Sequence, residues 1–125
     1  MVRYLTPTAI GLNAVTATTT SNDISVEGAK KVSMRLTRAS HSAGSSTFTV
    51  HGSVDGTNFA AINNIVTDVT NTNAQTITRV ASIALSSNTS QVVSLDLTYL
   101  TLKAIRVVAT IATDGSASAA VSVEL

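Results

Sequence analysis

Histidines and carboxylates are the residues from which this chain would build a metal or catalytic site. His41 and His51 are the two histidines, and there is no cysteine. Zinc sites use three or four nitrogen, sulfur or oxygen ligands, and no third ligand lies at a typical spacing from either histidine. The many serines lack the Gly-x-Ser-x-Gly context of a hydrolase nucleophile. The sequence therefore predicts no enzyme, no zinc site and no cofactor.

Calcium is the metal that the oxygen-bearing side chains fit best. Asp55, Thr57 and Asn58 lie in one turn, and Asp68 lies in a later loop. Calcium takes roughly six to eight oxygen ligands, usually with several carboxylates. One acidic residue in each loop is fewer than a typical calcium site has. The pair Asp55-Gly56 is also the strongest short hairpin signal, because glycine accepts a positive φ. We interpret Asp55 as a turn residue, and calcium binding by a loop stays an open alternative.

Charge is scarce and limits the partners. The 125 residues include 8 Lys and Arg and 7 Asp and Glu, for a net charge of +1. Neutralising nucleic-acid phosphates needs a clustered basic surface, so we expect no nucleic-acid partner. No apolar run approaches the ~20 residues that span a bilayer, and the first residues lack a signal-peptide core. We expect folding in the cytoplasm of the cell that makes the protein and no membrane partner.

The elements that position these residues are predicted to be strands. Residues 46–54 alternate, with Phe48 and Val50 on one face and Thr47 and Thr49 on the other. A period of two indicates a half-buried strand. Further strands are expected at these ranges: 9–19, 24–26, 31–37, 58–65, 75–85, 92–100, 102–111 and 117–125. About eight strands separated by turn signals predict an all-β fold, an antiparallel β-sandwich or jelly roll that forms a single domain over residues 9–125.

Three segments are candidates for docking to a partner. Residues 1–8 are predicted to form an arm, because Pro7 favours extended structure before it. This arm either frays or reaches a neighbouring subunit with Tyr4 and Leu5 as anchors. Arg35 and Arg38 make their strand the most basic part of the chain, as a solvated face or as a docking face for an acidic surface.

The polar segment 67–74 is predicted to be an exposed loop. Its docking candidates are Asp68, Asn71 and Asn73. The outward apolar residues Val92 and Val108 are candidates for contacts between subunits.

Residues 48–59, F-T-V-H-G-S-V-D-G-T-N-F, carry a resemblance to known proteins. They resemble a segment of small β-sandwich virion proteins of tailed phages and related viruses, in which a strand ends in a Ser-x-Asp-Gly-x-Asn-aromatic hairpin. The strand L-K-A-I-R-V at 102–107 is similar to a late strand of the same group. A similar hairpin occurs in discoidin-like jelly rolls, which bind sugars or lipids. Those proteins usually have tryptophan at the position of Phe59 and aromatic-rich loops, which this chain lacks.

The resemblance implies a structural virion protein, of the capsid decoration or cement type. Such a protein binds the outside of the shell and holds capsomers together, often as a trimer. Its expected partners are the major capsid protein, other virion subunits and further copies of itself. The alternative is a carbohydrate- or surface-binding module of a phage fibre or spike, which needs a groove or an exposed aromatic residue. Tyr4, Phe48, Phe59 and Tyr99 are the aromatic candidates.

Overall fold

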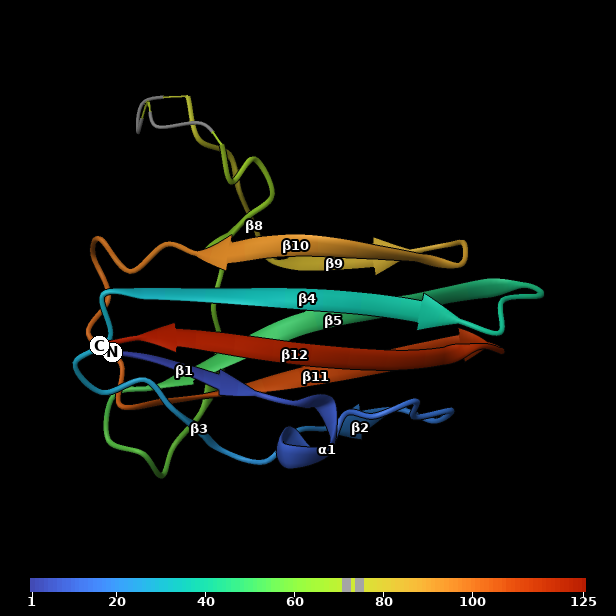
Figure 1. Ribbon diagram of the computed structural model, residues 1–125, viewed down its shortest axis with the longest axis horizontal. Coiled ribbons are helices and arrows are strands. Elements are labelled where there is room, and N and C mark those ends of the chain that lie inside the picture. Colours follow the sequence, from blue (N-terminus) through green and yellow to red (C-terminus); the bar gives the residue numbers. More distant parts are fainter. Residues whose placement is uncertain (71–72, 74–75) are drawn as a thin grey trace.

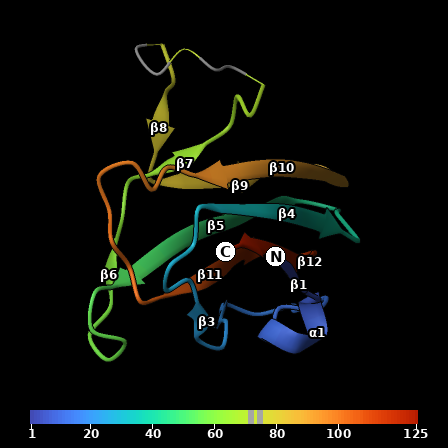
Figure 2. The same ribbon diagram turned by 60° about the vertical axis from the view of Figure 1, so that its left-hand side comes forward.

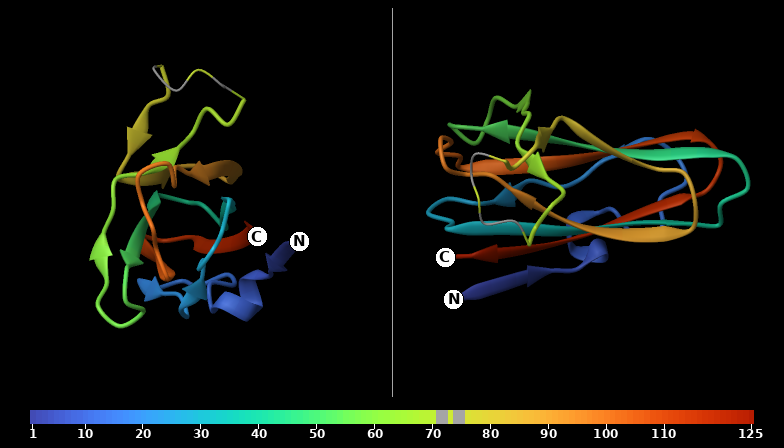
Figure 3. Two further views of the ribbon diagram at one scale, coloured as in Figure 1. Left: turned by 90° about the vertical axis from the view of Figure 1, so that its left-hand side faces the viewer. Right: turned by 90° about the horizontal axis from the view of Figure 1, so that it is seen from above.

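The computed structural model describes residues 1–70, 73 and 76–125 and consists of two packed antiparallel sheets (Figures 1 and 3). The first sheet, called the β4 sheet, has the order β1 (Val2–Leu5), β12 (Ser116–Glu124), β4 (Lys31–Ala39), β10 (Thr89–Leu95), β7 (Ile65–Val66), β8 (Arg79–Val80). The second, called the β5 sheet, has β2 (Thr19–Thr20) and β3 (Ile24–Ser25) on one edge of β11 (Ala104–Thr113), followed by β5 (Gly44–Ser53), then β6 (Ala60–Ala61) and β9 (Ser82–Leu85).

The eight main strands have the order of a jelly roll. They form the half-sheets β1-β12-β4-β10 and β2-β11-β5-β9, and the chain alternates between the two halves except where β9 follows β5. Residues 54–81 are inserted at that point and carry the short strands β6, β7 and β8. The predicted β-sandwich of about eight strands is therefore confirmed.

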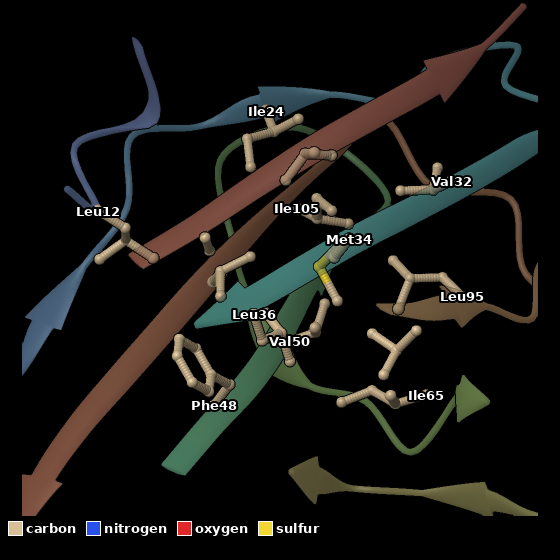
Figure 4. Close-up of a cluster of buried hydrophobic side chains, with 14 of the residues drawn as sticks. Leu12, Ile24, Val32, Met34, Leu36, Phe48, Val50, Ile65, Leu95 and Ile105 are labelled. Carbon is tan, nitrogen blue, oxygen red and sulfur yellow. The ribbon is translucent and has the colours of Figure 1, made fainter. Parts of the chain in front are cut away.

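The core lies between the two sheets (Figure 4). Val32, Met34 and Leu36 point inward from β4, and Phe48 and Val50 point inward from β5, as their alternation predicts. All five side chains are at most 1% exposed. The alternating pattern therefore identified the buried face of both long strands.

The N-terminal residues form an edge strand and not a separate arm. β1 pairs with β12 from Val2↔Glu124 to Leu5↔Val121, and the chain ends lie side by side (Figure 1). Leu5 points inward and packs against the core, and Arg3 donates from Nη2 to the backbone oxygen of Ser25 across the sandwich at 2.6 Å. Inward contacts of Arg3 and Leu5 hold these residues in the domain.

The prediction of a strand at residues 9–19 is wrong, because a short helix extends to Ile10. α1 (Pro7–Ile10) follows Thr6, whose side chain accepts a hydrogen bond from the backbone N–H of Ala9. Proline suits the first helical position, and Gly11 ends the helix with a φ of 79°. Only Thr19–Thr20 of the expected strand pairs with β11.

Two other expected strands are divided between the sheets. In the range 58–65, β6 pairs with β5 and β7 starts in the opposite sheet. In the range 75–85, β8 belongs to the β4 sheet and β9 to the β5 sheet. The second range is apolar at both odd and even positions because the chain crosses from one sheet to the other there.

Three connections between the sheets meet at one end of the sandwich, on the right in Figure 1. They join β4 to β5, β9 to β10, and β11 to β12. The buried Arg38 lies among them and donates to Ser46 Oγ at 2.8 Å, to His41 Nδ1 at 3.1 Å and to the backbone oxygen of Ala43 at 2.9 Å. Asp114 Oδ1 lies 3.4 Å from Nη2 of the same guanidinium. We call this cluster the Arg38 corner.

The loops of the Arg38 corner are also bonded to one another. Asp114 Oδ1 accepts from the backbone N–H groups of Ser42 and Ala43 at 3.1 and 3.0 Å. Asn88 Oδ1 accepts from the backbone N–H of His41 at 2.8 Å, which adds the third connection. Gly115 has a φ of 91°, and a Cβ there would lie 2.5 Å from the Arg38 guanidinium. The tight packing around the guanidinium therefore requires glycine at this position.

The prediction of Arg38 as a docking residue is wrong. Its side chain has 0% exposure, because position 38 continues the inward series of β4. The guanidinium uses its donors inside the protein and has none directed to a partner.

We expect the substitution Arg38→Met to lower the free energy of unfolding by about 3 kcal/mol, because it leaves buried acceptors without donors. The matched control is Arg35→Met on the outer face of the same strand, with an expected change within about 0.5 kcal/mol. Urea denaturation measures both. Equal effects of the two substitutions would contradict the structural role of the Arg38 corner.

We expect Leu5→Ala to lower the free energy of unfolding by about 1–2 kcal/mol, because Leu5 packs partly against the core. Tyr4→Ala, in the same strand but facing outward, should cost about 0.5 kcal/mol or less. Thermal denaturation of the two variants compares them. If both variants unfold like the parent protein, residues 1–5 are not an integral strand.

Candidate docking surface

Tyr4 and Arg35 come together on the outer face of the β4 sheet. Strand β12 lies between their strands, with Ser122 opposite Tyr4 and Ala120 opposite Arg35. Val92 of β10 is opposite Arg35 on the other side. Because side chains two residues apart share a face, these five side chains all lie on the side away from the core. We call this surface the Tyr4–Arg35 face.

A shallow depression of about 170 Å³ lies in the Tyr4–Arg35 face. Ser33, Ser122 and Ala120 line it, so its floor is made of small side chains. Tyr4 and Val92 border it and are 57% and 53% exposed. A flat surface of this kind admits close approach of another protein, and exposed apolar side chains on it gain from burial.

Arg35 is an exposed cation on this face without an ion-pair partner among the residues that the structure describes. At the margin of the sheet, Lys31 and Glu124 pair with each other at 4.0 Å. The charge available for an intermolecular ion pair is therefore that of Arg35. Tyrosine and arginine are also the residue types that interfaces favour.

On the outer face of the β5 sheet, by contrast, the cation has an ion-pair partner. Its cation, Arg106, pairs with Asp23 at 2.5 Å and lies over the Phe59 ring, 3.8 Å from the centroid. Val108 is half-buried there, opposite Thr49 of β5. The charge on this face is already neutralised within the molecule, which leaves the Tyr4–Arg35 face as the stronger docking candidate.

The remaining predicted docking residues lie elsewhere. Leu5 faces the core and Arg38 is buried, so neither belongs to the Tyr4–Arg35 face. Asp68 lies beyond β7, in the segment that extends away from the sandwich (Figures 1 and 2), and its carboxylate accepts a hydrogen bond from Thr70 Oγ1. Asn73 is exposed in the same segment. Asn71 lies outside the described residues.

A cleft of about 380 Å³ adjoins the extended segment. Asp68, Lys30, Arg79 and Asp96 are among its lining residues, and none of them borders the depression of the Tyr4–Arg35 face. Of the predicted docking residues, Tyr4 and Arg35 therefore lie on one surface and Asp68 lies on another.

Asp55 has its carboxylate oxygens occupied within its own loop. Oδ1 accepts from the backbone N–H groups of Asn58 and Thr57 and from Ser53 Oγ, each at 2.8 Å, and Oδ2 accepts from the Asn58 amide. The backbone N–H of Asn58, with these further donors, lowers the pKa of Asp55 well below its usual range. The loop is longer than a two-residue hairpin turn, because Gly52 pairs with Ala60. These hydrogen bonds show that the Asp55 carboxylate holds its own loop together.

The histidines do not form a metal site with these acids. His41 belongs to the Arg38 corner, and His51 lies opposite Arg106 in the β5 sheet. Within the described ranges 1–70, 73 and 76–125, no group of three histidine or acidic residues is placed to hold a metal ion.

Sequence reasoning missed the small residues that make the docking floor. Ala120, Ser122 and Ser33 carry no signal of their own, and they form a surface only through the pairing of β12 with both β1 and β4. The alternation along each strand indicates that these side chains face outward. It does not indicate which residues lie beside them across the sheet.

No family model and no curated protein matches the chain. Among solved structures, the SPBc2 prophage-derived protein YomS is similar over 99% of this chain and 94% of its own, with 11% identity and a TM-score of 0.65. A structure of infectious bursal disease virus, Gx strain, is similar over 98% of this chain, with 13% identity and a TM-score of 0.50. This chain spans 32% of that viral chain. The fold is thus shared with a prophage protein and a viral protein, as the resemblance implied.

Across the residues that the structure describes, no helix has the length and apolar character needed to cross a membrane.

We expect the free energy of unfolding to fall as the pH is lowered below about 4. Hydrogen bonds from backbone N–H groups lower the pKa of Asp55 and Asp114 in the folded state. An aspartate in the unfolded state has a pKa of about 3.9, so the unfolded state binds more protons than the folded state below that pH. Acid therefore favours the unfolded state. Asp55→Asn and Asp114→Asn should each lower the unfolding temperature at pH 7. In each variant the free energy of unfolding should also decrease less steeply as the pH is lowered. A decline as steep as that of the parent protein in both variants would contradict this assignment.

Proposed function

We propose that this protein is a structural virion component that decorates the outside of a capsid shell and docks through the Tyr4–Arg35 face. The observation that carries the proposal is the unpaired Arg35 beside Tyr4 and Val92 on a flat floor of small side chains. The partner surface is apolar at its centre and supplies a carboxylate to Arg35. The fold shared with a prophage protein and a viral protein supports this function.

The free edge of β1 gives the docking surface a second means of attachment. β1 is the outermost strand of the β4 sheet, and its pairing is with β12. An edge strand offers unpaired backbone N–H and C=O groups to an added strand. A neighbouring subunit in extended conformation would pair along β1 and bring its side chains over Tyr4. Backbone hydrogen bonds would then add to the side-chain contacts of the face.

The proposed mechanism is stabilisation by selective binding. A decoration protein that bridges neighbouring capsid subunits binds the assembled shell and not the separated subunits. Its binding free energy then adds to the stability of the shell by mass action. Further copies of this chain and the major capsid protein are the proposed partners, and the virion is the proposed location.

We expect Arg35→Glu to weaken binding to assembled shells at least tenfold, or about 1.4 kcal/mol, because a carboxylate at position 35 repels the partner's acid. The measurement is co-sedimentation of the protein with shells assembled from the major capsid protein encoded in the same genome. Binding of the parent protein should also weaken as the salt concentration rises.

The matched control for this experiment is Lys103→Glu, which makes the same change of charge at an exposed position outside the Tyr4–Arg35 face. This variant should bind like the parent protein. Equal loss in both variants would indicate a general charge effect and contradict docking through the face. Failure of the parent protein to bind shells, or to raise their melting temperature, would overturn the proposed function.

A further inference from the structure

Tyr99 is the most exposed aromatic side chain among the described residues, with 89% exposure. It lies in the segment between β10 and β11, at the end of the sandwich opposite the Arg38 corner (Figure 1). A pocket of about 230 Å³ adjoins it, with Ile62 and Leu100 as apolar walls. An exposed aromatic ring beside a concave surface is a typical feature of a ligand site.

The polar part of this pocket consists of Asn63, Asn64, Arg79 and Asp96. Arg79 Nε donates to Asp96 Oδ2, and the backbone N–H of Thr98 donates to Asp96 Oδ1 at 2.9 Å. Hydrogen bonds from Thr98 and from Arg79 lower the pKa of Asp96. The guanidinium and the carboxylate neutralise each other, so the pocket favours an uncharged ligand with several hydroxyl groups.

Asn64 is buried, with 4% exposure, and one of its polar atoms has no partner. Its Nδ2 donates to the backbone oxygen of Asp96 at 3.2 Å, and its backbone oxygen accepts from the N–H of Asp96 at 2.9 Å. These bonds fix the side chain, while Oδ1 accepts no hydrogen bond from the residues that the structure describes. Oδ1 is itself enclosed, so Asn64 acts here as a fixed part of the pocket wall.

A second hollow lies beside this pocket. The cleft of about 380 Å³ shares Arg79 and Asp96 with it and also presents Lys30, Ser94 and Thr98. The ion pair therefore forms a wall between two adjacent spaces. Ligand sites commonly occupy roughly 300–1,000 Å³, so the two spaces suit a ligand longer than one small ring.

We propose that Tyr99 and this pair of hollows form a binding site for a neutral oligosaccharide. A pyranose ring has one apolar C–H face, which would stack on Tyr99, and hydroxyl groups at its edge, which would bond Asn63 and Asp96. The other aromatic residues do not offer this combination. Phe48 is buried, Phe59 lies under Arg106, and Tyr4 borders a depression without an amide or a carboxylate.

The site shares no residue with the Tyr4–Arg35 face, so the two proposals stand or fall independently. A protein docked through that face keeps the pocket available. Shells decorated with this protein would then attach to a glycan-bearing surface.

The test is an NMR titration of the ¹⁵N-labelled protein with maltotriose, cellotriose, chitotriose and mannotriose. At least one trisaccharide should shift the backbone signals of Asn63, Tyr99 and Leu100 and the side-chain amide signal of Asn64. Tyr99→Ala should weaken this binding at least tenfold, because it removes the stacking surface. Tyr99→Phe should keep most of the affinity, because the ring remains. The exposure of Tyr99 makes both variants compatible with folding.

The control variants are Tyr4→Ala, the other exposed tyrosine, and Arg35→Glu. Both should bind the trisaccharide like the parent protein, and Tyr99→Ala should still bind shells. Absence of shifts with all four sugars would overturn the proposal, as would shifts confined to other residues. Unchanged affinity of Tyr99→Ala would overturn it as well.

Discussion

Burial of the Arg38 guanidinium is the constraint on which the arrangement of the two sheets depends. A charged group inside a protein is tolerated when its donors are bonded, and otherwise costs several kcal/mol. Here the acceptors come from β5, from the connection before it and from the connection between β11 and β12. Each of these segments must take one position to satisfy the same side chain. The guanidinium therefore holds both sheets at one end, and the hydrophobic core completes the contact between them.

The opposite end of the sandwich carries the pocket beside Tyr99, and the Tyr4–Arg35 face lies on the outer surface of the β4 sheet. Residues 54–81 are inserted at that end, and their crossing between the sheets brings Asn64 and Arg79 beside Asp96, the residue that follows β10. On the outer surface of the β4 sheet, Arg35 has no ion-pair partner within the described part of the chain, whereas Arg106 on the other sheet is paired with Asp23. The Arg38 corner and the surfaces proposed for recognition are thus located in different parts of one small domain.

The sequence predicted those features that depend on neighbours in the chain. Alternation identified the inward residues of β4 and β5, and the abundance of turn signals predicted the sandwich. The prediction failed at Arg38, where the charge indicated exposure but the alternation of β4, continued two residues beyond Leu36, indicated burial. Tyr4 and Arg35 were singled out separately, and only the pairing of β12 with both strands makes them neighbours. The cluster around Tyr99 and Asn64 depends on a crossing between sheets, for which no local pattern exists.

The pairing of β4 has a consequence for how the chain acquires its structure. This central strand is completed at residue 39, but its two partners, β10 and β12, are far later in the chain. During synthesis both of its edges stay unpaired until β10 and β12 have left the ribosome. Contacts between distant residues form slowly, because a long loop must close before they contribute. Folding of this domain therefore waits for β10 and β12, and β4 is the strand most exposed to mispairing with another nascent chain in that interval.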